Sequence, residues 1–138
     1  MADNVLSVGD STRRSLGFAS VGVWIAQVAV AGILLAGAFP KFFLYTPEGS
    51  MALAEALGVG RGVITMIGLV ELTVAALILI PRLHLWGGLL AAATMGGALF
   101  AHATKIGWSG NAAAEMWPLA LFALAAASTV VVYRYLRG

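Results

Sequence analysis

The sequence contains no cysteine and few charged residues. Without thiols the chain cannot hold an iron–sulfur cluster, a thiolate metal site or a catalytic disulfide, which excludes the quinone-linked membrane enzymes that form disulfides. Charged residues make up only 10% of the 138 residues, whereas soluble domains contain about 25%. Because the formal net charge is only +2, we also expect no nucleic-acid partner.

Histidine is scarce as well, and the spacing of the two histidines argues against a haem or metal site. His84 and His102 lie 18 residues apart, which is about 27 Å along a helix, so they cannot ligate one iron atom within a monomer. No histidines and carboxylates show the close helical spacing of a metal-binding pair. We therefore expect no metal site and no intrinsic cofactor.

What the sequence has in abundance is apolar residues, which make up 61% of the chain. Three windows carry no charge, namely 15–40, 83–104 and 116–133, and a fourth, 62–81, contains only Glu71. A helix needs about 20 mostly apolar residues to cross a bilayer. The sequence therefore predicts an all-α, polytopic membrane protein, an antiparallel bundle of four transmembrane helices in contact with the lipid bilayer.

The expected organisation is a single membrane domain with short tails. Residues 1–19 are expected to form a cytoplasmic N-terminal tail, 20–135 the four-helix membrane domain, and 136–138 a C-terminal tail. The four spans are expected near residues 20–40, 62–80, 83–103 and 116–134. Only a few residues separate the second span from the third, which predicts a tight antiparallel hairpin.

The first loop contains the signal of a shorter helix. Thr46-Pro47-Glu48 is a typical helix start, because it combines a capping residue, a proline at the first helical position and an acid in the first turn. A short apolar stripe follows and ends at Gly58. We predict a brief interfacial helix that lies at the membrane surface.

Positive charge is unevenly divided between the two sides of the predicted bundle. The side with both termini and the turn between the second and third spans carries five basic residues, namely Arg13, Arg14, Arg82, Arg134 and Arg137. The other side carries three, namely Lys41, Arg61 and Lys105. The positive-inside rule predicts a multi-pass protein of the cell (inner) membrane with both termini in the cytoplasm. The first two arginines partly resemble a twin-arginine export signal, but the apolar run after them is long enough to remain as a span.

Small residues recur at helical spacing within the predicted spans. They are Gly88, Ala92 and Gly96 on the third span, Gly32 and Ala36 on the first, and Ala123 and Ala127 on the fourth. Such stripes let helix backbones approach closely in lipid. We attribute nearly all of these glycines to helix packing, and the stripes would also permit a homodimer.

One charged residue lies deep inside a span. Glu71 is about ten residues from either end of the second span, near the bilayer midplane. A carboxylate at this depth costs at least about 2.5–3.5 kcal/mol, so it should face the bundle interior. Alone it would be neutral, because burial disfavours the charged form, whereas beside a cation it could stay ionised. Glu71 is either a proton-handling or ligand-binding carboxyl or a structural interhelical contact.

The outer end of the predicted bundle collects polar and aromatic side chains from several segments. We take Glu71 and His102 as candidate catalytic residues. The candidate ligand-binding residues are Lys41, Lys105, Trp108, Glu115 and Trp117. The alternative is an interfacial belt of aromatic and snorkelling basic side chains. Gln27, in the inner half of the first span, is expected to make a packing hydrogen bond.

Four motifs, in this order, resemble the DoxX-like family of small four-helix membrane proteins. They are Gly37-Ala38-Phe39-Pro40-Lys41-Phe42, Leu53-Ala54-Glu55-Ala56-Leu57-Gly58-Val59-Gly60, Ile67-Gly68-Leu69-Val70-Glu71-Leu72 and Gly97-Ala98-Leu99-Phe100-Ala101-His102. The resemblance covers about residues 20–135, with Val59-Gly60-Arg61-Gly62 where the family usually has a proline. It implies a four-helix fold with Lys41, Glu71 and His102 as the matched polar positions. Some members resemble membrane subunits of oxidoreductases, including a thiosulfate:quinone type, and others act as assembly factors or have no assigned role.

Three functions remain open. In the first, the chain is the membrane subunit or anchor of a redox system with a soluble or membrane oxidoreductase partner, and it binds a quinone or another lipophilic molecule near the outer face. Glu71 and His102 would then exchange protons, while Lys41 or Lys105 would stabilise developing negative charge. In the second, the chain is a non-catalytic scaffold or assembly factor. In the third, it is a small proton-coupled exporter, although such exporters carry their carboxylate in the first span.

Overall fold

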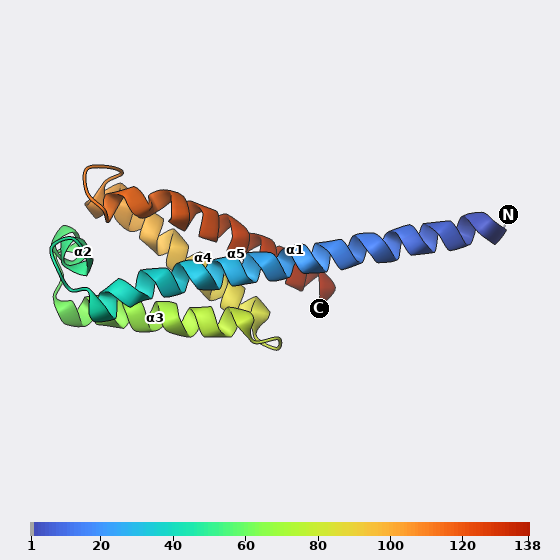
Figure 1. Cartoon of the computed structure of the whole chain (residues 1–138), viewed down its shortest axis with the longest axis horizontal. Coiled ribbons are helices and arrows are strands. Elements are labelled where there is room, and N and C mark those ends of the chain that lie inside the picture. The colour runs from blue at the N-terminus through green and yellow to red at the C-terminus, as the bar shows by residue number, and fades with distance from the viewer. Residues whose placement is uncertain (1) are drawn as a thin grey trace.

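The computed structural model describes the backbone of residues 2–138 and the side chains of residues 17–138, and it consists of helices joined by short loops. The helices are α1 (Ala2–Phe43), α2 (Ser50–Leu57), α3 (Arg61–Leu79), α4 (His84–Ala101) and α5 (Trp117–Arg137) (Figure 1). A π-helical turn at His102–Ile106 extends α4, and a 3-10 turn at Ala114–Met116 precedes α5. The described residues contain no strand, which confirms the all-α prediction.

Four helical segments are long and apolar enough to cross a membrane. They are Gly17–Phe43, Arg61–Leu79, His84–Ile106 and Ala114–Arg137. Their bounds lie within a few residues of the predicted spans. Helix α1 begins at Ala2, so the residues expected as a tail continue the first span as helix. Pro40 lies inside this helix without ending it, three residues before Phe43.

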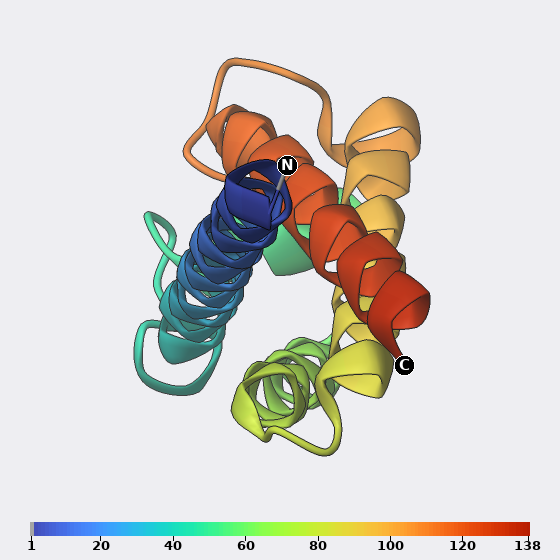
Figure 2. The same ribbon diagram turned by 90° about the vertical axis from the view of Figure 1, so that its right-hand side faces the viewer.

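The four long helices form a ring. Helix α1 packs against α3 and α5, and α4 packs against the same two helices from the opposite side. Both termini and the α3–α4 turn lie at one end, here called the termini end (Figure 1). Helix α2 and the α4–α5 loop lie at the other, here called the α2 end. Figure 2 looks along the bundle from the termini end and shows α2 lying across the far end of the ring.

The core is built largely from small residues, which let the helices approach closely. It contains Val30 and Leu34 of α1, Ala75 and Ile78 of α3, Ala91 of α4, and Ala123 and Ala127 of α5. Gly87 lies directly against the backbone of Ile78 at the α3–α4 hairpin, leaving no room for a Cβ. A Cβ at Gly88 would lie 2.9 Å from Val131 of α5. Gly88 thereby confirms the packing role expected of it, and Gly87 provides a second close approach between helices.

Other glycines of the small-residue stripes have no such packing role within one chain. A Cβ built at Gly32 of α1, or at Gly96 or Gly97 of α4, would have no neighbouring atom within 4 Å. The prediction that helix packing accounts for nearly all the glycines was therefore wrong for Gly32 and Gly96. Their helices are held by other contacts, and the space beside these glycines is open.

The short helix expected in the first loop is present as α2, but it begins later than predicted. The carbonyl of Thr46 accepts hydrogen bonds from the backbone N–H groups of Gly49 (2.9 Å) and Met51 (3.3 Å). Thr46 thereby closes a turn instead of capping a helix, and α2 starts at Ser50. The Ser50 hydroxyl donates to the carbonyl of Pro40 at 3.1 Å, which attaches α2 to the end of α1. Helix α2 ends at Leu57 and is capped by Gly58, as predicted, where φ is +68°.

Candidate functional site

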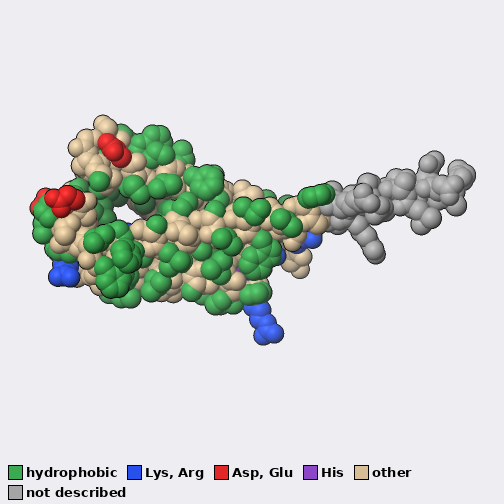
Figure 3. Space-filling view, viewed as in Figure 1, with side chains coloured by type: hydrophobic (Ala, Val, Ile, Leu, Met, Phe, Trp, Pro, Cys, Tyr) green, Lys and Arg blue, Asp and Glu red, His purple; other side chains and the backbone are tan. Residues whose placement is uncertain are grey.

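A cavity of about 870 Å³ lies between the spans at the α2 end. All four long helices and α2 contribute to its wall, which consists mainly of alanine, glycine and aliphatic side chains. Figure 3 shows the surface hollowed near α2, between α1 and α5. The volume falls within the range of about 300–1,000 Å³ that is typical of small-molecule sites. Four polar side chains line the cavity: Lys41, Glu71, Thr94 and His102.

Lys41 and Glu71 form a buried ion pair that joins α1 to α3. The Lys41 Nζ donates to Glu71 Oε2 at 2.8 Å, to Glu71 Oε1 at 3.0 Å and to the carbonyl of Gly37 at 2.7 Å. Both residues are less than a tenth exposed. An ammonium group has three protons, so Lys41 is fully engaged by these three acceptors. The pair explains how a carboxylate is accommodated in the middle of α3, because its charge is balanced at hydrogen-bond distance.

Two glycines allow α1 and α3 to approach closely enough for this pair. A Cβ at Gly37 would lie 3.5 Å from the Glu71 carboxylate oxygens. A Cβ at Gly68 would lie 3.1 Å from the ring of Phe42 and 3.2 Å from the Cβ of Lys41. Lys41 occupies the last turn of α1. The close contact between α1 and α3 therefore determines which part of α3 the Lys41 ammonium contacts.

His102 is buried at the first residue of the π-helical turn. Its Nδ1 lies 2.9 Å from the carbonyl oxygen of Gly107, and its own carbonyl accepts the backbone N–H of Gly107 at 2.9 Å. Gly107 has φ +83°, a conformation that a glycine adopts readily. A carbonyl can only accept, so Nδ1 carries the proton in this contact. The Nε2 of a neutral His102 is then an acceptor.

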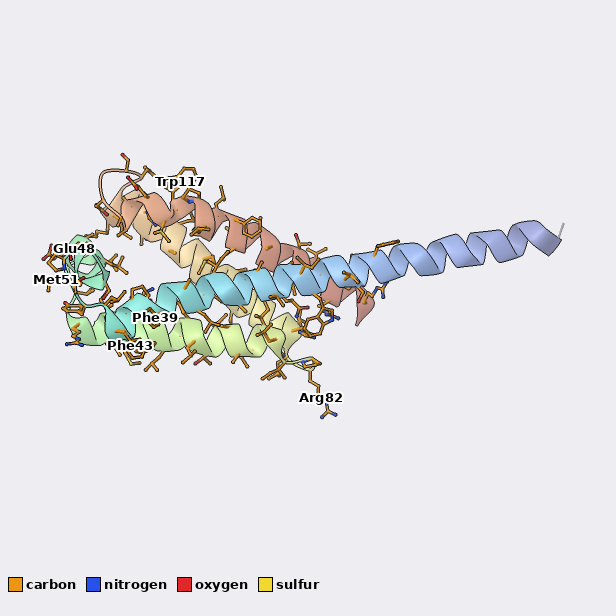
Figure 4. The ribbon with its side chains drawn as sticks, viewed as in Figure 1. Phe39, Phe43, Glu48, Met51, Arg82 and Trp117 are labelled. Carbon is orange, nitrogen blue, oxygen red and sulfur yellow. The ribbon has the colours of Figure 1, made fainter. Side chains whose placement is uncertain are left out.

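Two tryptophans extend this arrangement away from the cavity. The indole of Trp108 stacks on the imidazole of His102 with ring centroids 5.8 Å apart, and Trp117 meets Trp108 edge-on at 5.7 Å. Trp117 lies at the start of α5 near the α2 end, as Figure 4 shows. Neither tryptophan is part of the cavity wall. They pack behind His102 and restrict the orientation of its ring.

The candidate residues thus divide into three groups. Lys41, Glu71 and His102 line one cavity. Trp108 and Trp117 support His102 without reaching the cavity. Lys105 and Glu115 are exposed and lie outside the cavity wall. The sequence placed these residues toward one end of the bundle, except Glu71, which it placed near the bilayer midplane, and it did not predict the pairing of Lys41 with Glu71.

A second polar cluster lies at the termini end. Gln27 is fully buried, and its Nε2 donates to the carbonyl of Ile78 at 2.6 Å and contacts His84 Nδ1. The same His84 Nδ1 lies 2.9 Å from the carbonyl oxygen of Ile78. Arg134 donates to Gln27 Oε1 at 3.0 Å. These contacts confirm the hydrogen-bonding role predicted for Gln27. The roles of His84 and Arg134 were missed, although both are polar residues near the same predicted side.

No three His, Cys, Asp or Glu side chains are grouped so as to hold a metal ion among the residues with described side chains. The polar groups of the cavity are instead suited to hydrogen bonding and proton exchange. The apolar wall around them is suited to a lipophilic molecule.

Comparison with known proteins identifies the family. The family model described as the DoxX-like family matches residues 25–128, a range that begins in the first span and ends in the fourth. No curated protein and no solved structure matches the chain. The family match includes Lys41, Glu71 and His102, and it covers well over half of the sequence. The chain is a multi-pass membrane protein and belongs to the DoxX-like family.

Proposed function

We propose that this protein is the membrane subunit or anchor of a redox system and that its cavity binds a quinone or another lipophilic small molecule. The observation that carries the proposal is the cavity itself, about 870 Å³ of mainly apolar space inside a membrane-spanning bundle. Lys41, Glu71 and His102 supply polar groups in its wall. An apolar cavity with a few polar groups is the usual form of a small-molecule site.

Access to the cavity favours a ligand that comes from the lipid. Val63, Met66 and Val70 belong to its wall and are each about half exposed, so this part of α3 does not seal it. The hollow between α1 and α5 is open to the surface (Figure 3). A molecule dissolved in the bilayer could therefore enter sideways without crossing an aqueous loop.

Glu71 and His102 are the groups that we assign to proton exchange. A bound quinone supplies two-electron, two-proton chemistry, with the electrons taken from an oxidoreductase partner. His102 Nε2 can accept and return a proton while Gly107 holds its Nδ1–H. Glu71 can accept a proton if Lys41 retains its bond to the carbonyl of Gly37.

A pair of adjacent glycines provides the sharpest test. Gly97 lines the cavity and Gly96 does not, yet a Cβ at either position would meet no atom within 4 Å. We expect Gly97→Leu to fill part of the cavity and weaken binding of a decyl-substituted benzoquinone–hydroquinone couple at least about tenfold. Gly96→Leu should bind like the unaltered protein. Binding would be measured on protein in lipid nanodiscs, with thermal unfolding as the check on folding.

Equal binding of the quinone couple by both leucine variants would show that the cavity is not its binding site. If the unaltered protein binds neither the quinone nor the hydroquinone, quinones are excluded as the ligand. Both variants should unfold no more easily than the unaltered protein, because glycine is about 1 kcal/mol less favourable than a good helix former inside a helix.

We further propose that the termini end faces the cytoplasm and the cavity faces the opposite side of the cell membrane. Arg82, Arg134 and Arg137 share the termini end, and Arg82 extends away from the bundle in Figure 4. Lys41 is engaged inside the bundle by Glu71, so it is not a loop charge. The positive charge of the α2 end then falls to Arg61 and Lys105, which strengthens the asymmetry.

The absence of cysteine makes this orientation directly measurable. A single cysteine in place of Pro81, in the α3–α4 turn, or of Glu48, at the α2 end, would be the only thiol in the chain. Both positions are exposed, and neither is a basic residue. In intact cells a membrane-impermeant maleimide should label Glu48→Cys and spare Pro81→Cys until the cells are lysed. The reverse pattern would invert the orientation.

A scaffold or assembly role is the second candidate, favoured by the buried ion pair between Lys41 and Glu71. An ion pair that joins α1 to α3 at hydrogen-bond distance also holds a bundle together. The scaffold role requires partner assembly to be unaffected when the cavity is filled. Unchanged partner-dependent activity in Gly97→Leu, with binding of the quinone couple lost, would favour the scaffold over the redox subunit.

A further inference from the structure

We infer that the cavity selects ligands by their hydrogen-bond donors, and that it prefers a lipophilic molecule with a hydroxyl head over the same molecule with a carbonyl head. The inference rests on the proposed function, in that it assumes a small lipophilic ligand in the cavity, and it specifies the chemical class. It follows from counting the protons and lone pairs of the four polar side chains in the wall, Lys41, Glu71, Thr94 and His102.

Lys41 supplies the ammonium group of the wall, and it has no proton left to donate. Its three N–H bonds are directed to the two Glu71 oxygens and to the carbonyl of Gly37, at 2.7–3.0 Å. A ligand carbonyl could take one of these protons only by displacing the neutral carbonyl of Gly37, which would gain no additional hydrogen bond, or by displacing a charged Glu71 oxygen. Charge-assisted hydrogen bonds are roughly twice as strong as neutral ones, so that exchange is unfavourable.

Glu71 has the opposite character, because an ionised carboxylate can only accept. Lys41 is its only hydrogen-bond partner among the described residues, and each carboxylate oxygen receives one Lys41 proton. A carboxylate offers about four lone-pair sites, so about half of its accepting capacity remains. The residue forms part of the cavity wall, which makes that capacity available to a ligand.

His102 and Thr94 present acceptors as well. The Nδ1–H of His102 is held by the carbonyl of Gly107 at 2.9 Å, which leaves the Nε2 lone pair. The hydroxyl proton of Thr94 is held by the carbonyl of Leu90 at 2.7 Å, which leaves the oxygen lone pairs. The four polar side chains in the wall therefore offer several acceptors and no free donor.

A hydroxyl group complements this wall and a carbonyl does not. A phenol, hydroquinone or alcohol head can donate to Glu71 or to His102. A carbonyl oxygen in the same place would be desolvated without a partner, and an unmade hydrogen bond in a buried site is costly. Sites that are built to pair with a hydroxyl reject analogues without one for this reason. The shared chemistry is a lipophilic hydroxyl, whether it belongs to a hydroquinone or to another lipid-soluble alcohol.

Matched ligands test this inference. Binding of decyl hydroquinone, decyl benzoquinone and decyl hydroquinone dimethyl ether would be compared anaerobically on protein in nanodiscs. We expect the hydroquinone to bind at least about tenfold more tightly than the other two, which is the effect of one net hydrogen bond. A second pair, 4-decylphenol and its methyl ether, removes the redox chemistry. The phenol should again bind more tightly.

Substitutions in the cavity wall identify the side chains that produce the preference for hydroquinone. His102→Phe keeps a ring against Trp108 and removes the Nε2 acceptor, so the preference for hydroquinone should fall several-fold. Thr94→Val is nearly isosteric and removes the hydroxyl lone pairs, and it serves as the second variant if His102→Phe does not fold. The preference should persist in Gly96→Leu, which lies outside the cavity.

The outcomes separate this inference from the proposed function. Quinone or ether binding as tightly as hydroquinone, with loss in Gly97→Leu, would overturn the donor preference and keep the cavity as a lipophilic site. Absence of binding by every probe would overturn both. A preference that both His102→Phe and Thr94→Val leave intact would support the donor preference and assign it to the Glu71 carboxylate, the wall acceptor that neither variant removes.

Discussion

The two polar clusters of the bundle contain similar groups but differ in what surrounds them. At the termini end, His84 Nδ1 lies 2.9 Å from the carbonyl of Ile78, and Trp24 meets the imidazole edge-on. At the α2 end, His102 Nδ1 lies 2.9 Å from the carbonyl of Gly107, and Trp108 stacks on the imidazole. Each end also brings a basic side chain to a buried partner on another helix.

The difference between the clusters is the space beside them. Gln27 bonds to Ile78 and receives Arg134, and none of these residues lines the large cavity. At the α2 end the polar side chains retain free acceptors and face about 870 Å³ of space. A buried polar residue in a membrane protein is therefore not a functional site by virtue of burial alone. Unused hydrogen-bonding capacity beside an open volume is the more specific indication.

Backbone packing explains why one end is closed and the other open. Gly87 and Gly88 bring α4 against α3 and α5 near the α3–α4 turn, which leaves no room between the helices. Toward the α2 end, Gly32 and Gly97 have no atom within 4 Å of a built Cβ. Where a neighbouring helix packs directly on a small residue, the bundle is closed. Where no helix packs on the small residue, open space remains.

Among substitutions in the two clusters, Glu71→Gln is expected to cause the largest loss of stability. The substitution would leave the Lys41 ammonium buried without a counter-charge, which typically costs about 3–5 kcal/mol. We expect a large drop in thermal stability in detergent or nanodiscs. Glu55→Gln makes the same change at an exposed site on α2 and should shift stability by no more than about 0.5 kcal/mol. Similar melting of the two variants would mean that the pair does not hold α1 to α3.

A smaller loss of stability is expected at the termini end from Gln27→Leu. It would remove hydrogen bonds with Ile78 and Arg134 and leave buried groups unpaired, at a cost of about 1–3 kcal/mol. Ligand binding at the α2 end should be unchanged, which would be checked by titrating the variant with decyl hydroquinone. Thr73→Val, at an exposed position on α3, is the control for a polar-to-apolar change. A binding defect in Gln27→Leu would contradict the separation of the two clusters.

The smallest loss of stability is expected from Gly107→Ala, which acts on the positioning of His102. A residue with a side chain at φ +83° is strained by up to about 1–3 kcal/mol. Relaxation of the loop would relieve part of this strain, and it would move the carbonyl that holds His102 Nδ1. The expected result is a reduced preference for hydroquinone over quinone with only a modest change in melting temperature. Gly110→Ala, at φ +98° in the same loop, imposes comparable strain without touching His102. If both variants keep the full preference, the Gly107 carbonyl does not orient the ring.

Sequence patterns were sufficient for the helical elements but not for their contacts. The charge-free windows located the spans because the bilayer interior excludes charge over a fixed length of helix. Glu71 was recognisable as a buried group from its depth alone. The start of α2 was misplaced because the carbonyl of Thr46 closes a turn, a contact that the local helix-start pattern does not reveal.

The sequence by itself determined that this chain is a four-span membrane protein, that Glu71 lies inside it, and that several polar and aromatic residues gather toward one end. These are local or one-dimensional properties, set by the hydrocarbon thickness and by helical rise. Only the tertiary structure decided that Lys41 reaches Glu71, that Gln27 and Arg134 meet beside His84, and that a cavity remains at one end. Those outcomes depend on the relative rotation and register of helices, which are set by contacts between residues far apart in the chain.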